Sequence, residues 1–356
     1  MNILREFGHE YVICEETLLK GIARGDKEFA GPLIYAYDLH LTVEHARALA
    51  EAIGQCHHLD QVEFFFASQE EGAFAIILEA LRGCQSLQWL SVDNNNGPTY
   101  KKSPLTEKDV YLMAEMIPHH KELTMVCLQN IDLPTPALSA LLRACGHSTS
   151  LTKLRLFRSK LNIAHSKAIA DMLSNTTSLL RVSFHYNELD HQCINAICKA
   201  MRSNKNLVLQ ELSIGLNDID VLALSHLAMY LSYEKYPHCP IQKLDIAACN
   251  LQGVGHVLKE LLTNNKSLVE LDVTCNSFTL EDLKHIVQGV QQNEIIQKID
   301  IAGQPFYIAQ QLAPDPDIST SPKPVQQLMY ALEKKLADNR QSADANKTAS
   351  QPKSAI

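Results

Sequence analysis

The 356-residue chain lacks several features that would place it in a membrane or in a secreted class. It contains no apolar run of about 18 residues, and charged side chains occupy its N-terminus where a signal peptide would be apolar. Its ten cysteines include no CxxC pair, which argues against a redox motif or a zinc site. We therefore expect reduced thiols, no membrane span and a cytoplasmic location.

Motifs of nucleotide and hydrolytic chemistry are also missing. There is no P-loop, no GxGxxG, no GxSxG and no HExxH. The pairs His57-His58 and His119-His120 lie in polar connections where such side chains usually face solvent. We predict no catalytic residue, no metal site and no cofactor, and we expect the chain not to be an enzyme. The net charge of −8 argues against general nucleic-acid binding.

The sequence does contain a recurring motif, Leu-x-x-Leu-x-Leu, with Ile, Val or Phe as substitutes. It begins at Leu59, Leu87, Leu123, Leu151, Leu179, Leu209, Ile241, Leu268 and Ile296. A period near 28 residues is typical of a solenoid. The alternating Leu154 and Leu156 predict a short strand, and the spacing of Ile169, Met172 and Leu173 predicts a helix after it.

A turn position follows each strand, and it carries Asn95, Asn187, Asn217, Asn276 or, in one repeat, Cys249. An inward Asn can donate and accept hydrogen bonds to the backbone of neighbouring turns. Thr106 with Asp109, and Thr279 with Asp282, predict capping boxes at two helix starts. Each repeat is therefore predicted to be strand, turn and helix, with all strands in one parallel sheet.

This pattern resembles the ribonuclease-inhibitor type of leucine-rich repeat (LRR), whose consensus turn carries Asn or Cys. The resemblance covers about ten repeats over residues 33–304, although Asn is absent from the turn at positions such as Ser159 and Gln304. It implies a right-handed α/β horseshoe with the parallel sheet on its concave face and the helices on its convex face. The family shares a scaffold for holding partners rather than a chemistry.

The ends are expected to cap the stack. Residues 1–32 form the predicted N-terminal cap, with a helix around Glu15–Arg24. Residues 305–338 form a Pro-rich segment and a capping helix with Leu328, Leu332 and Leu336 on one face. The polar residues 339–356 are predicted to be a disordered tail.

The irregular repeats and the polar tail also resemble LRR effectors that intracellular bacteria translocate into host cells. This second resemblance implies a role in the host cytosol, with a host protein as the partner. We expect a monomeric, non-enzymatic scaffold for protein binding. The alternative is a solenoid that binds RNA or a ribonucleoprotein.

The alternation of strand residues predicts which side chains the concave face displays, with columns that start at Asp38, His40 and Thr42 in the first repeat. An exposed apolar run is predicted from Phe65, Phe66, Trp89, Met125, Phe157 and Tyr186. A central basic patch is predicted from Lys153, Arg155, Arg158, Arg181 and His185. Tyr100 lies in an insertion that should overhang the same rim. These twelve residues are the predicted partner-binding set.

Each zone also has a structural explanation. The aromatic residues could be covered by a loop or by the N-terminal cap, and the basic patch could be solvated charge. Basic and aromatic residues together also suit single-stranded nucleic acid. Further along, Asp245, Asp272 and Asp300 stack as like charges, and we expect Lys243 and Lys298 to neutralise them, with a basic partner or a cation as alternatives. A second insertion, 232–240, is interpreted as a tolerated loop.

Overall fold

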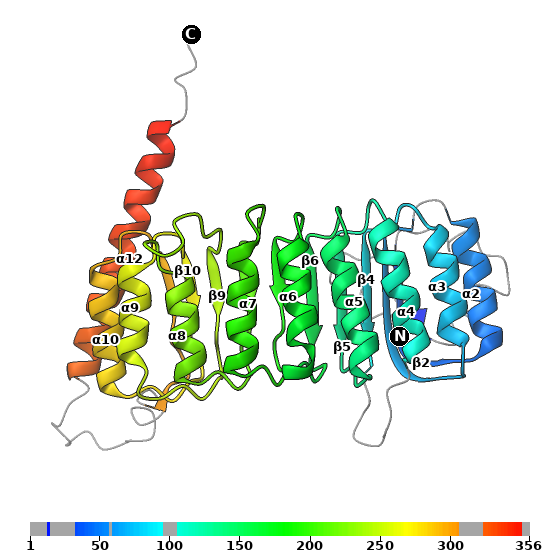
Figure 1. Cartoon of the computed structure of the whole chain (residues 1–356), viewed down its shortest axis with the longest axis horizontal. Helices are drawn as coiled ribbons and strands as arrows, with labels where there is room; N and C mark the ends of the chain where they lie inside the picture. Colours follow the sequence, from blue (N-terminus) through cyan, green and yellow to red (C-terminus); the bar gives the residue numbers. More distant parts are fainter. Residues whose placement is uncertain (1–12, 15–32, 57–58, 95–104, 306–322, 351–356) are drawn as a thin grey trace, which may run out of the picture. The chain divides into compact units, whose positions relative to one another are not determined.

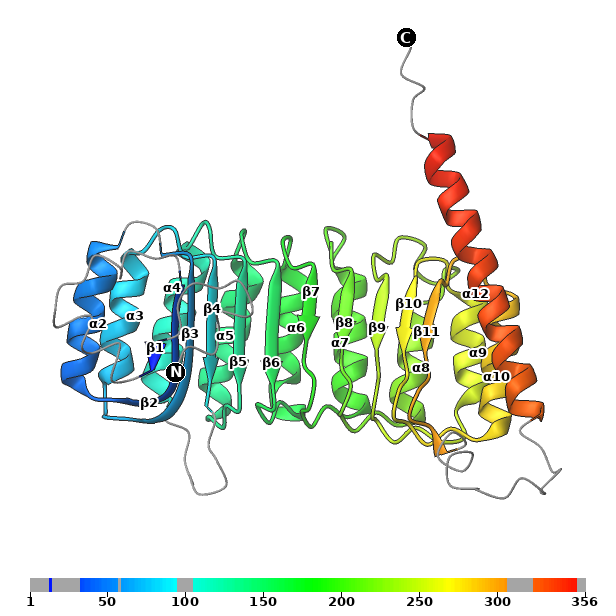
Figure 2. The ribbon, with the colours of Figure 1, turned by 180° about the vertical axis from the view of Figure 1, so that it is seen from behind.

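The computed structural model describes residues 13–14, 33–56, 59–94, 105–305 and 323–350. The chain divides into two compact units. Unit 1 comprises Met1–Asn187 with Ser203–Val208, and unit 2 comprises Glu188–Arg202 with Leu209–Ile356. Both are built from strand–turn–helix repeats (Figure 1, Figure 2). The predicted α/β solenoid with parallel strands is confirmed within each unit.

Unit 1 contains a parallel sheet whose strands follow the chain order. Its strands are β1 (Ile13–Cys14), β2 (Leu33–Leu41), β3 (Gln61–Gln69), β4 (Trp89–Asp93), β5 (Met125–Gln129), β6 (Lys153–Phe157) and β7 (Arg181–Ser183). Its α-helices are α2 (Val43–Gln55), α3 (Ala73–Gly83), α4 (Glu107–Met116), α5 (Thr135–His147) and α6 (Ser166–Asn175), and two short 3₁₀ helices cover Ile117–His119 and Ile163–His165. These helices lie on one face of the sheet (Figure 1).

Unit 2 repeats the arrangement with shorter strands. Its strands are β8 (Glu211–Ser213), β9 (Lys243–Asp245), β10 (Glu270–Asp272) and β11 (Lys298–Asp300). Its helices are α7 (His191–Ser203, apart from the last residue), α8 (Val221–Tyr230), α9 (Gly255–Asn264), α10 (Leu280–Gln291) and α12 (Lys323–Ser350).

The core of each unit lies between the strands and the helices. Leu154 and Leu156 of β6 and Met172 and Leu173 of α6 are fully buried, as the motif predicts. Each such side chain contributes roughly 1.5–3 kcal/mol of burial free energy. The two capping boxes are also confirmed, because the hydroxyl oxygens of Thr106 and Thr279 each accept the backbone N–H of the Asp three residues on, and each Thr donates its own backbone N–H to that Asp carboxylate.

The turn asparagines form the predicted ladder. Asn187 donates through Nδ2 to the carbonyls of Leu156 at 2.8 Å and Phe184 at 2.9 Å, and its Oδ1 accepts the N–H groups of Ser159 and Leu161. In the last repeat Gln304 takes this place, donating to the carbonyl of Val273 at 2.8 Å and accepting from Phe278 N–H. A longer amide therefore substitutes where the consensus Asn is missing.

A second ladder, which we did not predict, lies where each helix turns back toward the next strand. Asn265 donates to the carbonyl of Leu231, Asn293 donates to that of Leu262, and both accept the backbone N–H groups that follow them. Asn204 does the same in unit 1 by donating to the carbonyls of Leu173 and Thr176. These side chains satisfy the bare carbonyls at helix ends.

Helix α12 extends the second ladder and corrects the predicted tail. Asn339 donates to the carbonyls of Asn293 at 3.0 Å and Ile296 at 2.8 Å, while Leu332 and Leu336 are buried. The helix therefore docks against the last repeat and continues to Ser350. The prediction that residues from 339 onward are disordered is wrong as far as Ser350, because Asn339 anchors the helix beyond Leu336.

The predicted columns fail in the first repeat. Tyr35, rather than His40, lies opposite Glu63, and a break in register follows between Ala36 and Leu39. His40 instead pairs with Ser68, whose Oγ lies 2.7 Å from His40 Nδ1. Strands β2 and β3 have nine residues each, more than the motif implies. Extending the residue spacing of the later repeats back to the first repeat therefore pairs the wrong residues of β2 with β3. The predicted helix around Glu15–Arg24 and most of the N-terminal cap lie outside the described residues.

Candidate functional site

The candidate site is the open face of the unit 1 sheet, defined as the face that points away from helices α2–α6 (Figure 2). The strand register confirms the first predicted column, which runs Gln61, Trp89, Met125, Lys153, Arg181. The second runs Glu63, Ser91, Cys127, Arg155, Ser183. Adjacent strands are about 4.8 Å apart, so neighbours in a column are in reach of one another.

Phe66 does not belong to this face, and its predicted role in partner binding is wrong. It is fully buried and stacks on Phe64, with ring centroids 5.6 Å apart, and it meets the edge of Phe74 at 4.9 Å. Successive residues of a strand point to opposite faces, so Phe65 and Phe66 cannot both be displayed. Phe66 packs in the apolar core, and Phe65 lies partly exposed on the open face.

The predicted aromatic run is also interrupted. In the third column Phe65 lies opposite Asp93, Asp93 opposite Gln129, and Gln129 opposite Phe157. Burial raises the pKa of Asp93, and the Asn130 amide, which donates to Oδ1 at 2.7 Å, opposes that rise. Trp89 and Met125 pair in the first column and are only partly exposed. Two polar residues, Asp93 and Gln129, therefore separate Phe65 from Phe157 in this column.

The residues that do come together are Phe157, Arg158, His185 and Tyr186, which we call the Phe157 cluster. The Phe157 ring lies 5.7 Å from Tyr186 and 6.1 Å from His185. The Arg158 guanidinium stands 5.3 Å from the centre of the Tyr186 ring, a cation–π contact. Tyr186 is 43% exposed. The cluster therefore places one cation over a tilted aromatic surface.

Backbone geometry explains how this cluster forms. Arg158 has φ of 50° and Tyr186 has φ of 57°, and both occupy the same position of their repeats, seven residues after the motif starts Leu151 and Leu179. The left-handed conformation costs a residue with a side chain about 1–2 kcal/mol. It recurs at Asn130, Leu216, Ala248 and Cys275, so the repeat itself imposes it. In unit 1 the kink brings Arg158 and Tyr186 of neighbouring turns into contact.

A basic group lies beside the cluster on the same strands. Lys153 and Arg155 flank Leu154 on β6, and Lys153 lies opposite Arg181 of β7. Arg155 and Arg181 are exposed and Lys153 is partly exposed. Within the described residues, no carboxylate forms an ion pair with Lys153, Arg155 or Arg158. The positive charges of Lys153, Arg155 and Arg158 are therefore available to an incoming ligand.

Cys127 lies beside Arg155 in the second column, and its thiol is buried. It is 5% exposed, and Gln129 Nε2 donates to its sulfur at 3.7 Å. Burial raises the pKa of the thiol, an effect that outweighs the opposing charge of Arg155. The thiolate is the reactive form of cysteine, so this residue is disfavoured as a catalyst.

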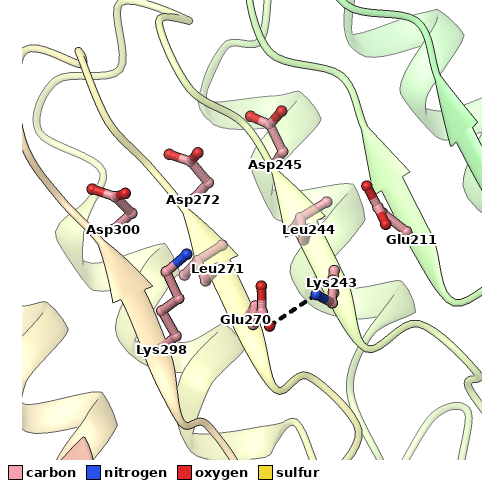
Figure 3. Close-up of a pocket in the computed structure, with 9 residues that line it drawn as sticks. All are labelled: Glu211, Lys243, Leu244, Asp245, Glu270, Leu271, Asp272, Lys298 and Asp300. Carbon is pink, nitrogen blue, oxygen red and sulfur yellow. Dashed lines mark ion pairs between the residues drawn. The ribbon is translucent and has the colours of Figure 1, made fainter. Parts of the chain in front are cut away.

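The open face of unit 2 carries mostly acidic side chains, as Figure 3 shows. A hollow of about 220 Å³ is lined by the aspartates of three successive strands and by Glu211, Glu270, Lys243 and Lys298. Lys243 pairs with Glu270 at 2.8 Å rather than with an aspartate. Asp245, Asp272 and Asp300 each accept the backbone N–H two residues on, at Ala247, Thr274 and Ala302. Lys243 therefore forms no ion pair with the aspartates, contrary to the prediction, and their neutralisation by Lys298 stays a prediction.

The two predicted insertions are the segment that contains Tyr100 and the segment 232–240. Tyr100 and the rest of 95–104 lie outside the described residues. The segment 232–240 is folded, because the Tyr236 ring packs on the buried Tyr230 at 5.2 Å and Tyr233 N–H donates to the carbonyl of Asn264. Among the described residues, no group of three or more His, Cys, Asp or Glu side chains could hold a metal ion. No helix in the described part of the chain is long and apolar enough to span a membrane.

Sequence relatives of this chain include two mouse proteins named for their domains. NACHT, LRR and PYD domains-containing protein 14 of Mus musculus is 26% identical over 200 residues, which cover 49% of this chain and 20% of that protein. NACHT, LRR and PYD domains-containing protein 12 of Mus musculus is 29% identical over 168 residues, covering 46% of this chain and 15% of that protein. The matches thus span a fifth or less of these relatives. No family model matches the chain.

Among solved structures, a tropomodulin C-terminal domain from Caenorhabditis elegans aligns with 68% of this chain and 99% of that chain. The identity is 9% and the TM-score is 0.32, so this likeness carries no argument about function. The repeats, the parallel strands and the LRR relatives together identify the chain as a leucine-rich-repeat protein with an α/β solenoid fold.

Proposed function

We propose that the chain is a non-enzymatic scaffold whose open face in unit 1 binds an acidic segment of a partner protein. The observation that carries the proposal is the Phe157 cluster beside Lys153, Arg155 and Arg181. Aromatic rings and arginines are the residue types that dominate protein interfaces. The side chains of the partner should be acidic, because Lys153, Arg155 and Arg158 form no ion pair within the described residues.

The binding set follows from the geometry described above. Phe157, Tyr186 and Arg158 form its centre, Lys153, Arg155 and Arg181 supply charge, and His185 lies at its edge. Trp89 and Met125 extend the set along the first column, and Phe65 lies further away across Asp93 and Gln129. Phe66 is excluded by burial. Tyr100 stays a prediction.

RNA binding is the second candidate, favoured by the same mixture of aromatic and basic residues. The net charge of −8 disfavours it, since the phosphate backbone would be repelled elsewhere on the protein. The two candidates differ in salt dependence. Phosphate contacts make affinity fall steeply with salt, whereas an interface centred on aromatic rings changes less.

Direct binding tests the proposal with two fluorescent probes, a random copolymer of glutamate and tyrosine and a single-stranded RNA. Anisotropy should show tighter binding of the copolymer, and the double variant Lys153→Glu, Arg155→Glu should weaken it at least about tenfold through charge repulsion. The matched control is Lys108→Glu, Lys167→Glu, two exposed lysines of helices α4 and α6, which should bind as wild type does. Tighter binding of the RNA with a steep salt slope would favour the second candidate, and equal affinity of both variants would remove the site.

The bacterial-effector assignment is a separate proposal, supported by the resemblance of the irregular repeats and by no residue of the binding face. If the chain acts in a host cytosol, a fusion to a reporter enzyme should be delivered into infected cells by a bacterium that translocates effectors. Delivery that is absent under those conditions would reject the effector role while leaving the binding face in place.

A further inference from the structure

Two strands of the unit 1 open face place like charges opposite each other. Lys153 of β6 pairs with Arg181 of β7, and Arg155 lies two residues further along β6 on the same face. Neighbouring strands are about 4.8 Å apart, and residues i and i+2 of one strand are about 6.6 Å apart. Three cations therefore share a small area of the sheet. Like charges directly opposite each other destabilise a sheet unless another group compensates them.

The same column of unit 2 shows how the repeat otherwise avoids this repulsion. Acidic and basic residues alternate there from strand to strand, in the order Glu211, Lys243, Glu270, Lys298. Lys243 and Glu270 form an ion pair at 2.8 Å (Figure 3). Lys153 and Arg181 depart from this alternation, and Lys153 forms no ion pair within the described residues. The fold itself therefore does not require two cations side by side at this position.

A run of like charges also occurs in the second column of unit 2, where hydrogen bonds compensate it. Asp245, Asp272 and Asp300 lie opposite one another, and each accepts a backbone N–H of its own strand end. Lysine and arginine side chains only donate hydrogen bonds, so a backbone N–H cannot compensate them in this way. Lys153 and Arg155 form no ion pair within the part of the chain that the structure describes. An anion brought by a partner is the group that would compensate both.

The number of donors on this area suits a phosphoryl group better than a carboxylate. A carboxylate has two oxygens, whereas a phosphoserine side chain has three strong acceptor oxygens and a charge of about −1.5 to −2. Lys153 lies opposite Arg181, and the next outward pair along the same two strands is Arg155 with Ser183. Ser183 is partly exposed, and its hydroxyl is a fourth donor. Arginine also pairs with phosphate through two parallel hydrogen bonds.

An aromatic surface continues the same strand beyond the cations. Phe157 follows Arg155 by two residues on the open face and is partly exposed, and the Tyr186 ring lies 5.7 Å from it. An extended segment that runs along β6 directs alternate side chains to the sheet, with the same spacing of about 6.6 Å. A phosphorylated residue over Arg155 therefore places the residue two positions away over Phe157. That second residue should be apolar or aromatic.

We propose that the acidic segment bound by unit 1 is a phosphorylated, extended segment of the partner protein. Its phosphoryl group lies among Lys153, Arg155 and Arg181, and an apolar residue two positions away packs on Phe157. This inference rests on the proposed function and narrows its partner to one chemical class. Clusters of arginines are a recurrent means of recognising phosphorylated motifs. Binding then depends on the phosphorylation of the partner, so that the scaffold distinguishes the modified form from the unmodified one.

Fluorescence anisotropy of short labelled peptides with the full chain tests this inference. The first peptide, Gly-Phe-Gly-pSer-Gly-Phe-Gly, places Phe two positions from the phosphoserine in either direction. The second, Gly-Phe-Glu-Glu-Gly-Phe-Gly, carries a similar charge on two carboxylates. The phosphoserine peptide should bind at least about tenfold more tightly, because its three oxygens meet three cations. Inorganic phosphate lacks the apolar contact and should displace this peptide only at a concentration far above that of the unlabelled peptide.

The outcomes separate this inference from the proposed function. Equal affinity of the two peptides would overturn the role of phosphate and leave the binding of an acidic segment in place. Inorganic phosphate that competes as well as the unlabelled phosphoserine peptide would overturn the extended segment. If neither peptide binds while the copolymer of glutamate and tyrosine does, the phosphorylated partner is rejected alone. If the copolymer does not bind either, the proposed function fails with it.

A variant that keeps the charge distinguishes phosphate recognition from simple attraction. Arg155→Lys retains the positive charge and removes the planar fork of donors that pairs with phosphate. It should weaken binding of the phosphoserine peptide at least about fivefold and of the diglutamate peptide by less, so the ratio of the two affinities falls. The matched control is Arg47→Lys on the exposed side of α2, which should leave that ratio unchanged. The same ratio in Arg155→Lys as in wild type, with matching circular dichroism spectra, would contradict the inference.

Discussion

At the scale of single residues, Asn187 ties together the backbone of two neighbouring turns. Asn187→Ala should lower the free energy of unfolding by about 2–4 kcal/mol, because it leaves the Ser159 and Leu161 N–H groups and the Leu156 carbonyl without their partner. The control, Asn175→Ala, removes one exposed bond to the carbonyl of Asp171 and should change stability by less than about 0.5 kcal/mol. Urea unfolding of both variants measures the difference, and equal losses would contradict the ladder.

His120 occupies the second ladder in unit 1, where later repeats place Asn. It is 3% exposed, and its Nε2 lies 3.1 Å from the carbonyl of Leu81. Burial lowers the pKa of His120 below 6.5, more than the hydrogen bonds to the Leu81 and Arg82 backbone raise it. The folded state therefore holds the neutral ring at a pH where the unfolded chain takes up a proton.

A pH dependence follows from this difference. The stabilising effect of neutral His120 is complete above about pH 6.5 and is lost as the pH falls toward the lowered pKa of the folded state. His120→Asn keeps a donor for the Leu81 carbonyl and cannot titrate. The free energy of unfolding should thus drop more in wild type than in His120→Asn between pH 7.5 and pH 5.5. Identical pH profiles for the two proteins would show that His120 titrates equally in both states.

At the scale of helices and strands, the packing of α5 on α6 depends on Gly146. A Cβ atom at this position would lie 2.7 Å from the Cα of Met172 and 2.9 Å from its carbonyl oxygen, so the two helices would have to move apart. Gly146→Ala should destabilise unit 1 by roughly 1–3 kcal/mol. Gly54→Ala in α2 meets no atom within 4 Å and should stabilise by about 0.5–1 kcal/mol. Thermal unfolding of both variants tests the pair, and a shared sign would refute the close contact.

The same scale shows which elements the sequence could predict. The strands and helices follow from apolar spacing, and the capping boxes at Thr106 and Thr279 follow from local chemistry. The sequence could also have predicted the second ladder, since Thr176, Asn265 and Asn293 each stand three residues before a motif start. The register of β2 could not be predicted because it depends on a break in strand pairing, and the length of α12 could not because it depends on two hydrogen bonds of Asn339.

At the scale of the whole molecule, the candidate site could be predicted only in part. Strand alternation gave the columns that contain Lys153, Arg155 and Phe157, and the register confirms them. Because β3 continues to Gln69, the alternation of its side chains also places Phe66 in the core and not on the open face. The contact of Arg158 with Tyr186 depends on the left-handed backbone conformation of both residues. The sequence does not reveal this conformation, because residues as different as Asn130, Leu216 and Cys275 adopt it at the same position of other repeats.

The central claim is that the open face of unit 1 binds a protein. The most direct measurement is chemical cross-linking in nuclease-treated cell extract, followed by mass spectrometry, with three forms of the full chain. These are the wild type, the face variant Arg155→Glu, Phe157→Ala, and the control Lys108→Glu, Lys167→Glu. We predict a protein that wild type and the control capture equally and that the face variant loses. Equal capture by all three forms would contradict the account and move the binding surface away from the Phe157 cluster.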